Sequence, residues 1–137
     1  GRARLAELSL PLGADLPMGV WGEPLRARGI GDAIERLPPL PPLRLVLAHP
    51  GVPVSTPAVF KALTSRDNPP LRALPARFED VGHLVEWLSA TRNDLEAAAT
   101  AIAPSIAETL ATLRATPGCL FARMSGSGAT CFGVFEA

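Results

Sequence analysis

The first residue of this sequence that could do chemistry is an aspartate in a loop. Asp15 lies between Gly13 and Pro17, two residues that interrupt regular structure. A carboxylate held in such a loop could accept a proton from a substrate hydroxyl or bind a metal ion. It could also accept hydrogen bonds from the backbone N–H groups of its own turn, which is the commoner use of an aspartate there. The residue spacing alone leaves both interpretations open.

A Ser-Gly-Ser-Gly tetrad is the second candidate, formed by Ser125, Gly126, Ser127 and Gly128 and named the Ser-Gly loop below. Glycines let the backbone come close to a ligand, and successive N–H groups in such a turn can bind an anion. The tetrad is not a Walker A loop, because no Gly-Lys-Ser/Thr follows it. A plain turn between two strands is the simpler interpretation of a lone Gly/Ser tetrad.

Three ring side chains could also take part in binding. Phe60, on an expected short helix, could stack on a base, although an aromatic residue in that setting more often belongs to the core. His49 precedes Pro-Gly at the end of an expected strand, and His83 is followed by Trp87 one helical turn later, so packing explains both histidines. Neither histidine has a cysteine or an acidic residue at the spacing of a zinc site. The sequence therefore predicts no metal-binding residues.

The composition argues against several classes of function. The chain has 137 residues, the usual size of one domain, and its 13 basic and 13 acidic residues give a formal net charge of zero. This is not the basic surface of a nucleic-acid-binding protein, so we expect neither nucleic acid nor a membrane as partner. No apolar run approaches the roughly 20 residues of a membrane span. Two cysteines, Cys119 and Cys131, cannot form a disulfide framework, which favours a reducing, cytoplasmic location.

Glycines and prolines divide the first half of the chain into short elements. Proline fixes its own φ and restricts the residue before it, so the proline-rich segment in this half must be extended. Apolar runs and their spacing assign the rest. The expected elements are a helix ending near residue 10, a short strand at 18–21, hairpin strands at 24–28 and 33–37, an extended segment at 38–42 and a buried strand at 44–48.

Capping residues mark the helices of the second half. Ser55 or Thr56 can cap a short helix that has Pro57 at its first position and runs through Leu63. A second helix is expected over residues 78–88.

The most clearly specified helix follows Asn93. Asn93 can cap it, and Glu96, three residues later, would complete a capping box. Pro104 should kink or restart this helix. One face carries an apolar stripe made of Leu95, Ala99, Ile102, Ile106, Leu110 and Leu113. Strands at 119–124 and 130–135 then flank the Ser-Gly loop, and the whole pattern predicts an α+β fold.

Four segments, taken in their order along the chain, resemble the GHMP family of small-molecule kinases. They are Leu12–Pro17 (Leu-Gly-Ala-Asp-Leu-Pro), His49–Phe60 (His-Pro-Gly-Val-Pro-Val-Ser-Thr-Pro-Ala-Val-Phe), Arg92–Glu96 (Arg-Asn-Asp-Leu-Glu) and Arg123–Thr130 (Arg-Met-Ser-Gly-Ser-Gly-Ala-Thr). The similarity runs through essentially the whole chain. It implies a GHMP-kinase C-terminal domain over residues 29–137, with an antiparallel sheet packed with helices. Residues 1–28 would be a remnant of the N-terminal, ribosomal-protein-S5-like domain.

The first two segments resemble one branch of this family. Its members transfer the γ-phosphoryl group of ATP, with Mg²⁺, to a hydroxyl of a cytidine diphosphate-linked methylerythritol in the non-mevalonate isoprenoid pathway. The resemblance implies that Asp15 is the catalytic aspartate and that the Ser-Gly loop, from Ser125 to Gly128, approaches the nucleotide phosphates. It assigns the substrate to Ala14, Thr56, Pro57 and Phe60, with the Phe60 ring stacking on the cytosine.

The sequence also departs from the family pattern. The lysine partner of the catalytic aspartate and a Gly-Leu-Gly-Ser-Ser phosphate loop are not found, and Lys61, the only lysine, directly follows Phe60. The aromatic residue and the histidine expected on the other side of the cytosine are not found either. Asn93 and Asp94 match a further family segment, and helix capping explains them. We therefore expect the C-terminal half of such a kinase, inactive by itself.

Two other functions stay open. Another small-molecule GHMP kinase, acting on homoserine or a mevalonate, is disfavoured by Ser-Thr-Pro-x-x-Phe, because only a cytidine-bearing substrate needs that aromatic. The alternative from a different class is a non-catalytic α+β ligand-binding or interaction module. Arg36, Pro39 and Pro42 match the spacing of a polyproline II ligand for SH3-type grooves, although a stiff connection before a strand is the simpler explanation.

Overall fold

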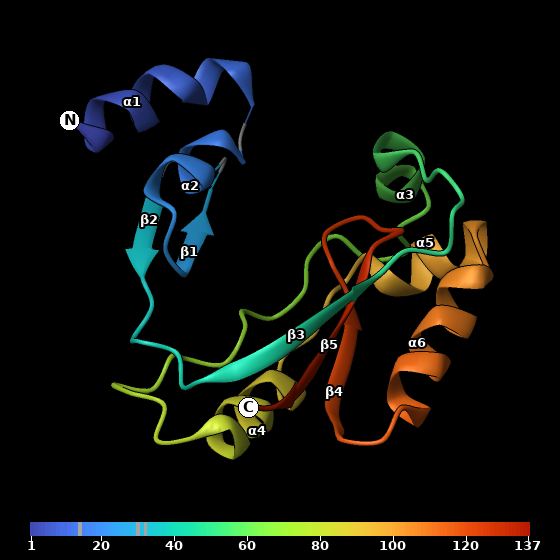
Figure 1. Ribbon diagram of the computed structural model, residues 1–137. Coiled ribbons are helices and arrows are strands. Elements are labelled where there is room, and N and C mark those ends of the chain that lie inside the picture. The colour runs from blue at the N-terminus through green and yellow to red at the C-terminus, as the bar shows by residue number, and fades with distance from the viewer. Residues whose placement is uncertain (14, 30, 32) are drawn as a thin grey trace. The chain divides into compact units, whose positions relative to one another are not determined.

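The computed structural model describes residues 1–13, 15–29, 31 and 33–137, which form two compact units. One unit comprises residues 1–40 and 74–78, and the other comprises residues 41–73 and 79–137. Each contains helices and antiparallel strands (Figure 1), so the predicted α+β class is confirmed. The domain boundary after residue 28 stays a prediction. Across the described residues, every helix is too short or too polar to cross a membrane.

The first unit consists of short helices and a hairpin. Helices α1 (Arg2–Ser9) and α2 (Leu16–Trp21) are joined by the 3-10 turn η1 (Leu10–Leu12) and the residues after it. Strands β1 (Leu25–Arg28) and β2 (Ala33–Arg36) pair antiparallel, which confirms the predicted hairpin.

The strand predicted at residues 18–21 is wrong, because these residues lie in α2. Pro17 occupies the first turn of this helix, where its missing N–H has no partner to lose and its fixed φ favours the helix. Gly22 ends the helix in the left-handed conformation, with a φ of 64°. These start and stop residues outweigh the short apolar run between them, which fits either a strand or a helix.

A three-stranded antiparallel sheet organises the second unit. Strands β3 (Leu43–Ala48), β4 (Cys119–Met124) and β5 (Cys131–Glu136) lie in the order β3-β5-β4 (Figure 1). β4 and β5 form the predicted pair around the Ser-Gly loop, with Met124 opposite Cys131. Cys131 is fully buried, and burial raises the pKa of its thiol. This thiol therefore stays protonated and unreactive at neutral pH.

The described part of the second unit contains α3 (Thr56–Lys61), α4 (Val81–Ser89), α5 (Glu96–Ile102) and α6 (Ser105–Ala115). Pro104 separates α5 from α6, so the helix restarts there as one of the two predicted outcomes. Helix α6 packs on β4 and β5, and most of the predicted stripe is buried: Ala99, Ile106, Leu110 and Leu113. Ile102, the last residue of α5, is 45% exposed.

The strand predicted at residues 44–48 forms, but the prediction that it is buried is wrong. Leu45 is 58% exposed and Leu47 is 71% exposed. β3 lies at the edge of the sheet as described and pairs there with β5 alone. A run of leucine and valine predicts a strand, but it does not say whether another layer covers that strand.

Candidate functional site

The start of α3 brings a predicted substrate residue to the Ser-Gly loop. Ser55 caps the helix, because its hydroxyl accepts a hydrogen bond from the Ala58 backbone N–H at 3.4 Å, and Pro57 lies in the first turn. Since Ser55 does the capping, the Thr56 hydroxyl can make another contact. Its Oγ1 lies 2.7 Å from Oγ of Ser127, which is a hydrogen bond. The structure therefore joins two predicted site regions that are far apart in the sequence.

Two backbone hydrogen bonds hold the base of the Ser-Gly loop. The Ser125 N–H donates to the carbonyl of Thr130 at 2.8 Å, and the Gly128 N–H donates to the carbonyl of Ser125 at 3.1 Å. Gly126 and Gly128 have φ angles of 55° and 88°, a region that other residues rarely adopt. The segment is thus the tight inter-strand turn that its glycines indicate.

Asn93 connects the start of α5 to this loop, which sequence reasoning did not predict. Its Nδ2 donates to the carbonyls of Met124 at 3.0 Å and Gly126 at 2.8 Å, while its Oδ1 accepts from the Leu95 N–H at 3.0 Å. The Glu96 carboxylate accepts from the Met124 N–H at 3.0 Å. The predicted capping box is wrong, because Glu96 binds β4; the Asn93 oxygen still accepts from the start of the helix, but its nitrogen binds β4 and the loop. No local pattern could have revealed partners about 30 residues away.

A cavity of about 580 Å³ lies against α3, the start of α5 and the loop. This Phe60 cavity is lined by Phe60, Leu63, Ser65, Arg66, Asn68, Arg92, Asn93, Asp94, Leu95 and Gly126. Arg66 stabilises the part of the cavity wall that contains Phe60, because its guanidinium donates to the Phe60 carbonyl at 3.3 Å. Phe60 is 47% exposed, whereas its neighbour Val59 is fully buried. Val59 is therefore the core residue of α3, and Phe60 is accessible to a ligand.

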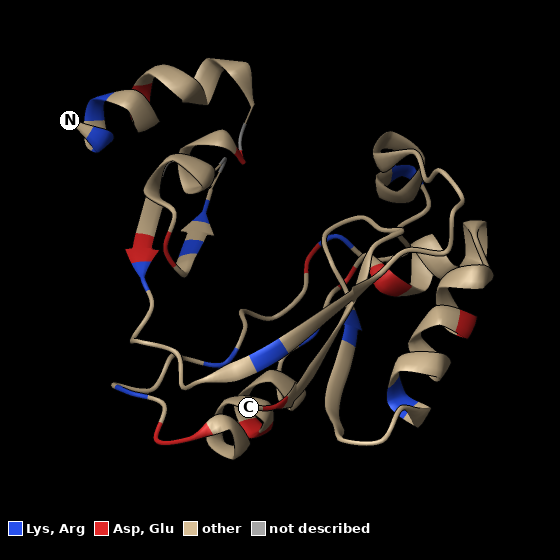
Figure 2. Ribbon diagram, in the orientation of Figure 1, with Lys and Arg blue, Asp and Glu red and all other residues tan. Residues whose placement is uncertain are grey.

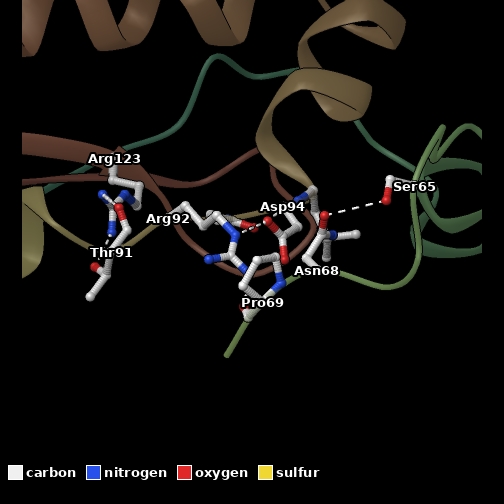
Figure 3. Close-up of polar contacts among 9 residues, drawn as sticks. Ser65, Asn68, Pro69, Thr91, Arg92, Asp94 and Arg123 are labelled. Carbon is white, nitrogen blue, oxygen red and sulfur yellow. Dashed lines mark hydrogen bonds and ion pairs between the residues drawn. The ribbon is translucent and has the colours of Figure 1, made fainter. Parts of the chain in front are cut away.

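Polar contacts order another part of the cavity wall (Figure 3). The Arg92 Nε pairs with the Asp94 carboxylate at 2.6 Å, and the same guanidinium donates to the Pro69 carbonyl. The Ser65 hydroxyl donates to the side-chain oxygen of Asn68 at 3.3 Å. These contacts hold the segment between α3 and α4 beside the cavity. Sequence reasoning had not assigned a role to any of them except Asp94.

Arg123, in β4, forms hydrogen bonds with the end of α4 and the residues after it (Figure 3). It donates to Oγ1 of Thr91 at 2.8 Å, to the Thr91 carbonyl at 2.8 Å and to the Leu88 carbonyl at 3.0 Å. Burial lowers the pKa of Arg123, while the charge of Glu96 acts in the opposite direction. Because an arginine pKa starts far above neutrality, the guanidinium remains charged. Its role is to fix the chain just before Asn93.

Acidic and basic residues are interspersed along the elements (Figure 2), in agreement with the net charge of zero. The described residues contain no group of three or more His, Cys, Asp or Glu side chains that could hold a metal ion.

Asp15 belongs to the first unit and directly precedes α2. It is exposed, and among the described residues its side chain makes no capping hydrogen bond to that helix. In the described part of the chain this side chain therefore does not act as the cap of α2, and its catalytic role stays a prediction. Ala14, the other predicted residue of this loop, lies outside the described residues. Thr56, Phe60 and the Ser-Gly loop are brought together in the second unit.

The second unit, which contains the Ser-Gly loop, matches a known protein family. Residues 70–137 match the family model "GHMP kinases C terminal". These residues are similar to the C-terminal domain of GHMP kinases, which confirms the family resemblance and the predicted C-terminal domain fold.

Individual relatives of this chain carry a more specific name. The chain is 58% identical over 130 residues to a 4-diphosphocytidyl-2-C-methyl-D-erythritol kinase of Cereibacter sphaeroides (strain ATCC 17025 / ATH 2.4.3), covering 92% of this chain and 46% of the relative. It is 50% identical over 141 residues to the kinase of that name from Jannaschia sp. (strain CCS1), covering 99% of this chain and 50% of the relative.

A solved structure agrees with these relatives. The crystal structure of 4-(cytidine 5'-diphospho)-2C-methyl-D-erythritol kinase superimposes with a TM-score of 0.72 at 33% identity, covering 95% of this chain and 47% of that one. The chain therefore spans about half the length of the proteins that it matches.

Proposed function

We propose that these residues form the C-terminal part of an ATP-dependent kinase, called the complete kinase below. Its acceptor would be 4-diphosphocytidyl-2-C-methyl-D-erythritol, and its place the non-mevalonate synthesis of isoprenoid precursors. Relatives with this name match nearly the whole chain. Within the structure, the observation that carries the proposal is Phe60, an exposed ring on a cavity beside the Ser-Gly loop. An exposed aromatic face is the partner that a cytosine ring requires.

In this proposal the acceptor and the nucleotide meet where α3 contacts the Ser-Gly loop. Phe60 stacks on the cytosine, while Thr56, Pro57 and Ala14 bind the rest of the acceptor. Gly126 leaves room for the phosphates of ATP, because a Cβ there would meet nothing within 4 Å, and loop N–H groups can donate to phosphate oxygens. The Thr56–Ser127 hydrogen bond supports this arrangement, because it couples the position of the acceptor helix to that of the loop.

Asp15 is proposed to align the acceptor hydroxyl and to receive its proton. The hydroxyl oxygen then forms a bond to the γ-phosphorus, the bond from that phosphorus to the bridging oxygen breaks, and ADP leaves with the electron pair. Phosphoryl transfer of this kind depends mainly on positioning and on charge stabilisation. Asp15 is exposed and, in the part of the chain that the structure describes, does not cap α2, which supports this role.

The proposal includes Mg²⁺ as the companion of ATP, where it neutralises phosphate charge. Proteins usually bind this ion through one or two carboxylates together with the substrate phosphates. The described residues offer no cluster of three or more such groups, so no resident metal site is assigned to them and no step is derived through the ion. The proposal also takes the protein to be cytoplasmic, with ATP and the acceptor as its partners.

Replacing Phe60 with alanine tests the acceptor assignment. Base–aromatic stacking contributes about 1–3 kcal/mol, so in the complete kinase we expect F60A to raise the KM for the cytidine acceptor by roughly 5- to 150-fold. The KM for ATP should stay near its wild-type value, and F60W should restore most of the acceptor affinity. V59A is the matched control, because Val59 is buried and its truncation should lower the Tm without selecting between substrates. Equal losses for both substrates in F60A, with a lower Tm, would assign Phe60 to structure alone.

The 137 residues by themselves are expected to be inactive. The lysine and the phosphate loop that the family resemblance requires are not among them, and phosphoryl transfer needs charge neutralisation around the γ-phosphate. Incubating the purified chain with ATP, Mg²⁺ and the acceptor should give no product above the protein-free background. Clear turnover would show that these residues hold a phosphate site that the proposal overlooks.

A further inference from the structure

The Asn93 amide uses every polar atom that it has. Its two N–H groups donate to the Met124 and Gly126 carbonyls at 3.0 and 2.8 Å, and its oxygen accepts from Leu95. An asparagine offers two donors and an acceptor in one plane, which fits this set of partners. A residue that only capped α5 would need the oxygen and not the two donors. The donors therefore serve the chain that leaves β4.

The hydrogen bonds to Asn93 fix the direction of two peptide units. In a trans peptide the carbonyl and the following N–H point in opposite directions. The Met124 carbonyl points to Asn93, and accordingly the next N–H, that of Ser125, points away and donates to Thr130. By the same geometry the Gly126 carbonyl points to Asn93, so the N–H of Ser127 is directed away from it.

A second side chain from the same helix start supports the first of these peptide units. The Glu96 carboxylate accepts from the Met124 N–H at 3.0 Å. The N–H and the carbonyl of Met124 are thus both held by residues at the start of α5. The loop cannot rotate about its first residues without breaking these hydrogen bonds.

We infer that Asn93 is a positioning residue for the Ser-Gly loop, which orients the Ser127 N–H toward the bound phosphates. The catalytic part of this inference rests on the proposed function, because that proposal brings ATP to the loop. The orientation of the loop itself rests only on the hydrogen bonds of Asn93. Asn93 thus acts through the loop and is distinct from a plain helix cap.

The exchange of Asn93 for aspartate separates the two roles. Aspartate is as good a cap as asparagine, and its charge is favourable near a helix N-terminus. A capping role alone therefore predicts that N93D keeps both Tm and activity. A positioning role predicts that N93D loses activity. The carboxylate has no N–H to donate, and it would face two carbonyl oxygens. Asn93→Ser, which keeps a capping oxygen without the amide or a charge, should behave like N93D.

In the complete kinase we expect N93D and Asn93→Ser to lower kcat/KM for ATP on the order of 10²-fold, the usual effect of a misplacement of about 1 Å. Although Asn93 lines the Phe60 cavity, its amide atoms all bind the protein itself, so the KM for the acceptor should change much less than kcat/KM for ATP. D80N is the matched control: Asp80 caps α4 through the His83 N–H at 2.8 Å, so this exchange alters an ordinary cap. It should leave the kinetic constants unchanged. Unchanged kinetics in both Asn93 variants would overturn the inference.

Hydrogen exchange in the 137-residue chain provides a readout that does not depend on activity. We expect faster exchange of the Ser125–Gly128 amides in N93D, with the amides of α6 unaffected and D80N like wild type. If these amides exchange faster while the complete wild-type kinase does not phosphorylate the acceptor, the positioning of the loop is supported and the proposed function is wrong. Unchanged exchange in the loop would overturn the inference even if the kinase is active.

Discussion

Replacing Asp15 with asparagine in the complete kinase is expected to lower kcat by about 10²- to 10⁴-fold, the usual contribution of a positioned general base. Asparagine keeps the size of the side chain and one acceptor oxygen, but it cannot take up the hydroxyl proton. The KM values for ATP and for the acceptor should change little, because the remaining contacts hold both substrates. Steady-state kinetics with each substrate varied in turn measures both effects.

The structure predicts that this variant folds normally. Asp15 is exposed, and among the described residues its side chain does not cap α2. Its replacement therefore removes no cap from α2, and the Tm should match that of wild type. E23Q is the control: Glu23 is another carboxylate of the first unit, paired with Arg36 at 3.1 Å on the surface, and such pairs contribute about 0–1 kcal/mol. If D15N retained most of its kcat, Asp15 would not be the catalytic aspartate.

The parts of this fold that sequence predicted are those with local causes. The hairpin of the first unit, the pair of strands around the Ser-Gly loop and the helix restart at Pro104 each follow from residues that fix the backbone where they stand. Ser55 caps α3 as one of the two candidates expected for that position. In these cases the backbone preference of one residue and the periodicity of its neighbours agree, and no distant contact is needed to decide the element.

The errors have a common physical origin in contacts that are distant in sequence. Leu45 and Leu47 have the composition of a covered strand, but exposure depends on what packs against β3. Asn93 and Glu96 have the spacing of a capping box, yet the Asn93 amide nitrogen and the Glu96 carboxylate bind β4 and the loop after it. For Phe60 the sequence offered a core position or a ring-stacking site; the side chain is 47% exposed, which excludes the core position, and the stacking role stays a prediction.

Replacing Gly128 with alanine should be the most destabilising change in the Ser-Gly loop. A Cβ at this position would lie 2.8 Å from the Met124 sulfur and 3.3 Å from Cδ1 of Ile106, both in the buried core. The φ of 88° adds strain for any residue with a side chain. Left-handed backbone costs about 1–2 kcal/mol and overpacking about 1–3 kcal/mol, so we expect G128A to lower the free energy of unfolding by roughly 2–5 kcal/mol.

G126A separates the two causes, because it carries the backbone strain without the collision. Gly126 has a φ of 55°, and a Cβ there would meet nothing within 4 Å. We expect this variant to lose only about 1–2 kcal/mol, the cost of the left-handed backbone. Urea unfolding of both variants, followed by circular dichroism, measures the difference. A larger loss in G128A would mean that Met124 and Ile106 define how near the loop lies to the core. Equal losses would show that the core shifts to accept the added methyl group, and that the close packing behind the loop does not fix the position of the loop.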